Sequence, residues 1–173
     1  MNTNLFFYSL TEIIISLLFG IILLYSTYRM LDRFIKKKYD IANDNLAFSV
    51  FSSSILFSVA YLISGIKAPI LNSLRMLSND GEYEGSLILD GFKYTSLFLI
   101  IILIAIGLVI YLSINLYTKM TKDVNEFNEI KANNIAVSLI MATIIISISI
   151  LIKESLYLML ETFVPYPDLP KIF

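Results

Sequence analysis

The chain contains no cysteine and no histidine among its 173 residues, and only 16% of the residues are charged. Without cysteine there can be no disulfide bond, no thiol chemistry and no iron–sulfur ligation. Without histidine the commonest metal ligand and the commonest general base are both missing. A net charge of −1 provides no large basic surface for nucleic acid. We therefore expect a protein that is not an enzyme, takes no cofactor or metal, and binds no nucleic acid.

Long apolar runs are what the sequence does contain, since 57% of its residues are hydrophobic. A helix needs about 20 apolar residues to cross a bilayer. Four blocks meet or approach that length, and the last can extend through Leu160. They are Leu5–Tyr28, Leu46–Ile66, Tyr94–Tyr117 and Ile135–Ile152. The sequence predicts an all-α membrane protein with four transmembrane helices in the lipid bilayer.

Lysine and arginine are distributed unevenly around these blocks. The first inter-helix loop carries five of them between Arg29 and Lys38, and none precedes the first block. Cytoplasmic loops are enriched in these residues. We therefore expect the 29–45 and 118–134 loops inside the cell and both chain termini outside.

Part of the chain is repeated without gaps. Residues 40–63 align with residues 129–152 at a constant offset of 89, and eight of the 24 pairs are identical. The identical pairs are Ile41/Ile130, Asn45/Asn134, Ala47/Ala136, Ser49/Ser138, Ile55/Ile144, Ser58/Ser147, Leu62/Leu151 and Ile63/Ile152. We expect two tandem, parallel two-helix repeats, 1–66 and 94–164, related by a pseudo-two-fold axis along the membrane normal. The 67–93 segment would connect them on the outer face, and the Pro-rich tail covers 165–173.

Small residues form two stripes on each repeated helix at 100° per residue. Stripe one is Ala47, Ser54 and Ser58, repeated as Ala136, Thr143 and Ser147. Stripe two, about 140° further round the helix, is Ser49, Ser53 and Ala60, repeated as Ser138, Ala142 and Ser149. Small residues let helices approach closely in lipid. We interpret both stripes as packing faces, with the first and third helices facing lipid; the alternative is that the hydroxyl groups line a polar path.

Polar residues stand where the two repeated helices begin. The candidate positions are Asp40, Asn45, Glu129 and Asn134. Asparagine and aspartate are strong N-caps, and acidic groups suit a helix N-terminus. If the asparagines are caps only, serine should replace either with little effect. The functional alternative brings both copies together as a cation or partner site.

These repeated positions carry a resemblance to a known family. Asp40, Ile41, Asn45 and Ala47, repeated as Glu129, Ile130, Asn134 and Ala136, resemble the pattern of the YjfL-like family of bacterial inner-membrane proteins, known as domain of unknown function 350. Members more usually carry glycine immediately before the asparagine, where this chain has Asp44 and Asn133, so it resembles a divergent member. The resemblance implies a small multi-pass inner-membrane protein with no established enzymatic activity, sometimes encoded near envelope-stress proteins.

Two classes of function fit these features. The first is a non-enzymatic membrane protein that assembles as a homo-oligomer or with a membrane-protein partner, in envelope stress or defence as the resemblance suggests. The second is a small ion channel or transporter, which the hydroxyl-rich repeated helices would serve.

Overall fold

The computed structural model describes residues 17–18, 20–65, 68–73, 87–121 and 125–164, which are all-α. A helix over 20–31 continues into the π-helical turn η1 (Asp32–Lys36). It is followed by α2 (Leu46–Ser64), a helical stretch over 68–73, α4 (Leu87–Met120), α5 (Glu126–Lys131) and α6 (Ile135–Glu161). Most of the expected first span, much of the 67–93 connector and the 165–173 tail lie outside the described residues.

Three helices in the described part of the chain are long and apolar enough to cross a membrane. They are Leu46–Ser73, Lys93–Met120 and Ile135–Glu161. They contain the second, third and fourth apolar blocks, and α6 continues to Glu161, as the extension of the fourth block predicts. By the length and composition of its helices, the chain is a multi-pass membrane protein.

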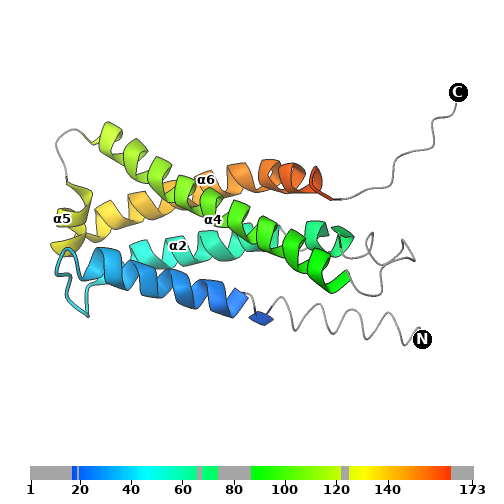
Figure 1. The fold of residues 1–173 in the computed structure, drawn as a ribbon. Coiled ribbons are helices and arrows are strands. Elements are labelled where there is room, and N and C mark those ends of the chain that lie inside the picture. Colours follow the sequence, from blue (N-terminus) through cyan, green and yellow to red (C-terminus); the bar gives the residue numbers. More distant parts are fainter. Residues whose placement is uncertain (1–16, 19, 66–67, 74–86, 122–124, 165–173) are drawn as a thin grey trace, which may run out of the picture.

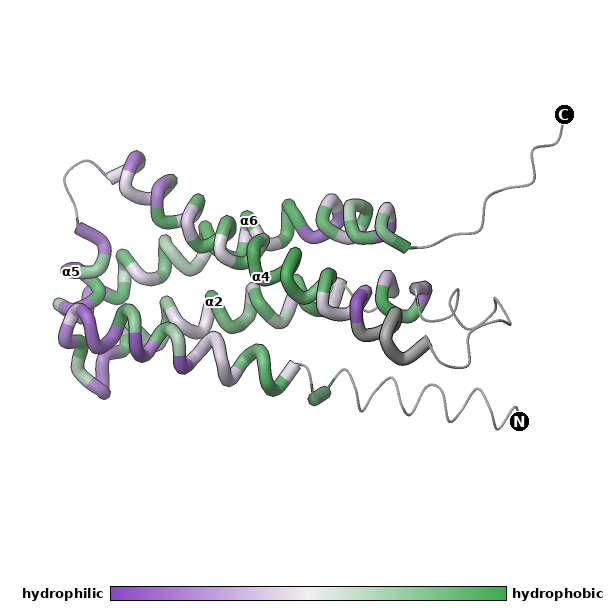
Figure 2. The backbone as a smooth tube through the Cα atoms, viewed as in Figure 1, coloured by the Kyte–Doolittle hydropathy of each residue, from purple (hydrophilic) through white to green (hydrophobic). Residues whose placement is uncertain are grey.

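α2 and α6 lie side by side and form the centre of the bundle, with α4 crossing them and the 20–31 helix beside α2 (Figure 1). The starts of α2 and α6 lie at the same end of the bundle as α5 and the loop that follows η1. Figure 2 shows hydrophilic residues gathered at that end and hydrophobic residues along the middle of the helices. The polar residues at the helix starts are therefore neighbours in space.

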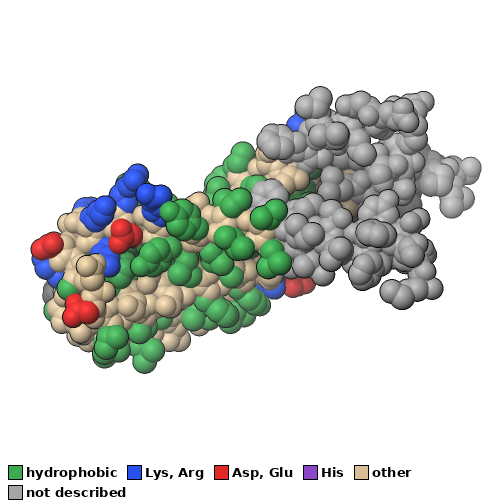
Figure 3. Space-filling view, turned by 90° about the horizontal axis from the view of Figure 1, so that it is seen from below, with side chains coloured by type: hydrophobic (Ala, Val, Ile, Leu, Met, Phe, Trp, Pro, Cys, Tyr) green, Lys and Arg blue, Asp and Glu red, His purple; other side chains and the backbone are tan. Residues whose placement is uncertain are grey.

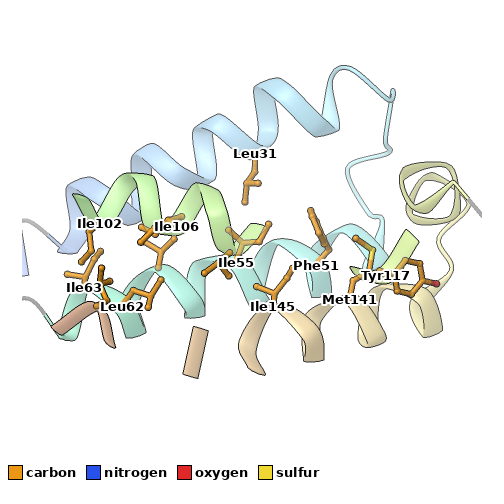
Figure 4. Close-up of a cluster of buried hydrophobic side chains, with 14 of the residues drawn as sticks. Leu31, Phe51, Ile55, Leu62, Ile63, Ile102, Ile106, Tyr117, Met141 and Ile145 are labelled. Carbon is orange, nitrogen blue, oxygen red and sulfur yellow. The ribbon is translucent and has the colours of Figure 1, made fainter. Parts of the chain in front are cut away.

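The core joins the three long helices (Figure 4). Phe51 and Ile55 of α2, Ile102 of α4 and Ile145 of α6 are all fully buried. Ile102 lies on the helix expected to face lipid, and that expectation holds for only one face of α4. The opposite face, which includes Ile104, remains exposed. Crossing α2 and α6 obliges α4 to bury one stripe of large apolar side chains, and van der Waals packing of this kind holds helices together in lipid.

Charged and hydrophobic side chains occupy different parts of the described surface (Figure 3). Hydrophobic side chains cover the body of the bundle, while lysine and arginine gather at the end that carries the loop after η1 (Figure 3). Exposed members of this basic group include Arg29, Arg33, Lys37 and Lys38. Their clustering beyond the apolar body matches a membrane-surface position. The placement of this end in the cytoplasm stays a prediction.

Candidate functional site

The start of α2 is held by two asparagine side chains. Asn45, which is only 4% exposed, is the N-cap, and its Oδ1 accepts a hydrogen bond from the Phe48 N–H at 2.7 Å. The Ala47 N–H donates to Oδ1 of Asn133 at 3.0 Å. The first N–H groups of a helix have no partner within the helix. These two amide oxygens therefore satisfy donors that would otherwise be orphaned.

Asn45 also bonds across the molecule. Its Nδ2 donates to the Ile130 carbonyl at 2.7 Å and approaches the Lys131 carbonyl at 3.3 Å. The partners are separated by 85 and 86 residues in the sequence. Together with the bond from Ala47 to Asn133, this contact ties the start of α2 to the turn before α6. We call Asn45, Ala47, Ile130 and Asn133 the asparagine clasp.

Asn133 reaches α2 because of its backbone conformation. It ends α5 in the left-handed region with φ 61°, which asparagine tolerates better than most residues. The Asn134 N–H bonds to the Glu129 carbonyl at 2.9 Å, and the Asn133 N–H bonds to the Ile130 carbonyl at 3.0 Å. This pair of bonds is the Schellman pattern at a helix C-terminus. The reversal leaves Asn133 facing α2 and lets the next residue start α6.

Asn134 occupies the position in α6 that Asn45 occupies in α2. It is the N-cap, with Oδ1 accepting from the Val137 N–H at 3.3 Å. Its Nδ2 donates to Oε2 of Glu129 at 2.8 Å. This second bond spans only five residues and stabilises the turn itself. The two asparagines thus share a capping role but differ in their second partner.

Asp40 lies at the edge of this cluster. Its backbone has φ 52°, and its side chain is 98% exposed. The Lys131 Nζ lies 3.9 Å from Oδ2 of Asp40, and an exposed pair of this kind contributes about 0–1 kcal/mol. A shallow open depression beside it is lined by Asp32, Lys36, Lys37, Asp40, Ile41 and Asn43. The two acids of the repeated pattern therefore differ, because Glu129 binds a side chain of the turn and Asp40 lies at the surface.

Aromatic side chains of α5, of α2 and of the loop before α2 contact one another near the clasp. Phe127 of α5 stacks on Tyr39 with ring centroids 4.7 Å apart. It also meets the ring edge of Phe51 in α2 at 6.3 Å. Both are favourable aromatic geometries. α5 is therefore packed against the loop and α2 as well as hydrogen-bonded to them.

Two further polar residues near this end were not singled out from the sequence. Glu126, in the first turn of α5, is buried, and Thr118 of α4 donates a hydrogen bond to its Oε1. An acidic residue at a helix start usually suggests an exposed group that favours the dipole. Nothing in the local pattern indicates that α4 covers Glu126, because the apolar periodicity stops before it.

The stripes of small residues are used unequally by α2 and α6. On α2, stripe one (Ala47, Ser54 and Ser58) is buried, and stripe two (Ser49, Ser53 and Ala60) is exposed. On α6 the pattern is reversed: Ala136, Thr143 and Ser147 are exposed, and Ser138, Ala142 and Ser149 are buried. Each of the two helices therefore has one buried stripe and one exposed stripe.

Contacts join α2 to α6 and to the turn before α6 near both ends of α2. Stripe one of α2 begins at Ala47, which bonds to Asn133, and the same face continues to Tyr61. The Lys153 Nζ of α6 lies over the Tyr61 ring, 4.1 Å from its centroid. Lys153 in turn continues the face of Ser149 by four residues. Tyr61, which continues the face of stripe one, and Lys153, which continues the face of stripe two, are therefore neighbours.

The chemistry available at the clasp is that of a structural joint. Its amide groups are neutral, and their described bonds run to backbone groups. Within the described part of the chain, no group of three or more acidic residues is arranged to hold a metal ion. The bonds position two helices of one bundle relative to each other.

These features define a multi-pass α-helical membrane protein whose central helices are joined at their starts. Residues 4–156 match the family described as Domain of Unknown Function (DUF350), and the chain belongs to that family. The resemblance drawn from the repeated acidic, asparagine and alanine positions is thereby confirmed. No match was found among the curated proteins or among the solved structures.

Proposed function

We propose that this protein is a non-enzymatic assembly module of the bacterial inner membrane, which associates with itself or with a membrane-protein partner. One observation carries the proposal: α2 and α6 each leave a stripe of small and hydroxyl-bearing residues exposed on a membrane-spanning segment. Lipid gains little from small residues, whereas a second helix can approach them closely. A role in envelope stress or defence remains part of the proposal through the family resemblance.

The finer architecture belongs to the same proposal. We infer two tandem two-helix units, 1–66 and 94–164, with four spans and both termini outside. The eight identities in 24 aligned pairs support the repeat. The common N-cap role of Asn45 and Asn134 supports it too.

The channel alternative needs hydroxyl groups that are available to water or ions. Several of these groups instead donate to carbonyls of their own helix. The Ser49 hydroxyl bonds to the Asn45 carbonyl at 3.0 Å, and that of Thr143 bonds to the Leu139 carbonyl at 2.9 Å. Self-satisfied hydroxyl groups can face a packed interface without further partners. This supports assembly over a polar path.

Two measurements on purified protein test the proposal. In lipid nanodiscs, the protein mass without the lipid should exceed the mass of one chain. Liposomes containing the assembled protein should show no ion flux above that of empty liposomes. A monomer with no co-purifying membrane protein would contradict the assembly role, and sustained flux would favour the channel.

A further inference from the structure

We propose that Arg29, Arg33 and Lys37, which we call the basic strip, bind the phosphate groups of anionic phospholipids in the leaflet at their end of the bundle. The three side chains are exposed and belong to the lysine and arginine group at the end that carries the loop after η1 (Figure 3). One chain carries the whole strip, so lipid binding does not require self-assembly.

The segment that carries the basic strip has two different faces. Leu31, Ile35 and Tyr39 recur every four residues and pack in or against the hydrophobic core. The basic strip recurs at the same spacing but two residues out of step, which corresponds to about 200° around a helix. Because its inner face is fixed to the bundle, the segment holds the basic strip on the outside.

Acidic side chains leave the basic strip without a counter-charge. Residues 29–40 contain five basic and two acidic residues. The two acids lie beside lysines outside the strip: Asp32 is 3.9 Å from the Lys36 Nζ, and Asp40 is 3.9 Å from the Lys131 Nζ. Among the described residues, no carboxylate lies within ion-pair distance of the strip. An anion from outside the chain can therefore bind there.

The depth of the basic strip in the membrane follows from its position beside α2. The Lys36 Nζ lies 5.7 Å from the ring centroid of Phe48, in the first turn of α2, where a membrane-spanning segment begins. The helix before η1 runs back along the bundle from this level (Figure 1). At about 1.5 Å per residue, Arg29 is about 10 Å nearer the middle of the bundle. A charged side chain at that depth extends towards the headgroups or pairs with a counter-charge, and lipid phosphates supply one.

The outward face of the same helix changes along its length as a bilayer does. Ile21, Tyr25 and Arg29 follow one another at four-residue spacing, and all three are exposed. Isoleucine suits the acyl chains, tyrosine is enriched at the membrane–water interface, and basic residues are attracted to anionic headgroups. One line of side chains thus passes from the hydrocarbon region to the headgroups, which favours a lipid over a soluble acidic partner.

Tyr25 orients Arg29 for a phosphate group. The Arg29 Nη1 donates to the Tyr25 hydroxyl at 2.9 Å, and the guanidinium carbon lies 5.8 Å from the centroid of the tyrosine ring. A guanidinium group has five N–H donors in a fixed fork, and the tyrosine uses one of them. The remaining donors can bond two oxygens of one phosphate, while Arg33 and Lys37 attract neighbouring phosphates by charge.

A competition between two lipids tests the proposal. The purified protein in neutral detergent is mixed with equal amounts of anionic phosphatidylglycerol and zwitterionic phosphatidylcholine, and the lipids bound per chain are counted by native mass spectrometry. Each basic residue near an anionic surface contributes about fivefold to binding. Arg29→Gln/Arg33→Gln should therefore lower the ratio of bound phosphatidylglycerol to phosphatidylcholine by about 25-fold. An unchanged ratio in a double variant with native circular dichroism would overturn the proposal.

Lys119→Gln/Lys131→Gln is the matched control, because it removes two exposed positive charges from the same end of the bundle. It should leave the lipid ratio nearly unchanged. An equal loss in both double variants would indicate diffuse attraction by net charge and overturn the assignment to the basic strip.

Lys37→Gln is the second test variant in case the double arginine variant does not fold. Its exposed position beyond η1 should tolerate glutamine, and the ratio should fall by about fivefold. A folded Lys37→Gln protein with the ratio of the unmodified protein would overturn the proposal.

Inorganic phosphate distinguishes a lipid from a free anion. Added at the concentration of the lipid phosphate, it should not displace phosphatidylglycerol, because it has no acyl chain to contact the apolar part of the outward face. Displacement would overturn the lipid assignment. Because lipids are counted per chain, a monomeric mass would contradict the proposed assembly role and leave the lipid site intact, whereas loss of lipid preference would leave self-assembly intact.

Discussion

Replacing Asn45 tests whether this residue contributes to the unfolding free energy through the clasp or only as a helix cap. Asn45→Asp preserves size and retains an oxygen that can accept from the Phe48 N–H. Aspartate is as good an N-cap as asparagine, and its charge suits the helix dipole. A residue that acts only as a cap should therefore tolerate aspartate or be stabilised by it. In the clasp, aspartate instead places an oxygen against the Ile130 carbonyl, where Nδ2 donates at 2.7 Å.

The magnitude follows from the bonds that change. Loss of one neutral hydrogen bond costs about 0.5–1.5 kcal/mol, and an unsatisfied buried acceptor costs about 1–3 kcal/mol. The Ile130 carbonyl still accepts from the Asn133 N–H, which keeps the cost near the lower range. We expect Asn45→Ser to lower the unfolding free energy by about 1–2 kcal/mol, and Asn45→Asp to lower it further through repulsion between two acceptors.

Asn125→Ser is the matched control. Asn125 is the exposed N-cap of α5, and its side chain accepts from the Asn128 N–H at 3.2 Å within the same helix. Because serine and asparagine cap about equally well, the expected change is below about 0.5 kcal/mol. Unfolding would be followed by circular dichroism during titration of mixed micelles with a denaturing detergent. Equal stability of the Asn45→Asp variant and the unmodified protein would refute the clasp.

Three other changes give separable results. Ser54→Leu, at a site 4% exposed, should overpack the buried face of α2, destabilise the protein by about 1–3 kcal/mol and lower the yield of folded protein. Thr143→Leu, on an exposed face, should preserve folding but reduce oligomer mass. Identical behaviour of the two variants in size-exclusion chromatography would contradict the different placement of their stripes. A membrane-impermeant thiol reagent applied outside cells should label a cysteine introduced at Asn79 but not at Lys37, and the reverse pattern would invert the topology. Lys153→Met should reduce stability by about 0.5–2 kcal/mol through loss of its cation–π contact, and the same detergent titration would reveal an unchanged midpoint if that contact contributes nothing.

The apolar runs predict the described spans well because membrane crossing depends on length and composition, which can be read directly from sequence. α4 and α6 extend beyond the blocks at their ends. The sequence does not identify which face of α4 is buried. Large residues such as Ile102 are equally compatible with lipid and with a protein core, so periodicity could not identify the face that α4 buries.

The candidate site was only partly predictable for a related reason. Asparagine at a helix start identifies Asn45 and Asn134 as caps through local chemistry. The bond from Asn45 to Ile130 depends on two segments 85 residues apart, and no local pattern reports that distance. Likewise, the positive φ of Asn133 is compatible with its residue type, but its use as an acceptor for α2 follows only from the tertiary arrangement.

α2 and α6 are joined near both ends of α2, by the asparagine clasp at the helix starts and by Lys153 over Tyr61 near the end of α2. Two parallel helices that are joined at two places resist moving apart, because separation at either place breaks a contact. The α2–α6 pair can still rotate together as one rigid unit. If the protein changes conformation in the bilayer, we expect the surrounding helices to move relative to the α2–α6 pair, which keeps its own arrangement.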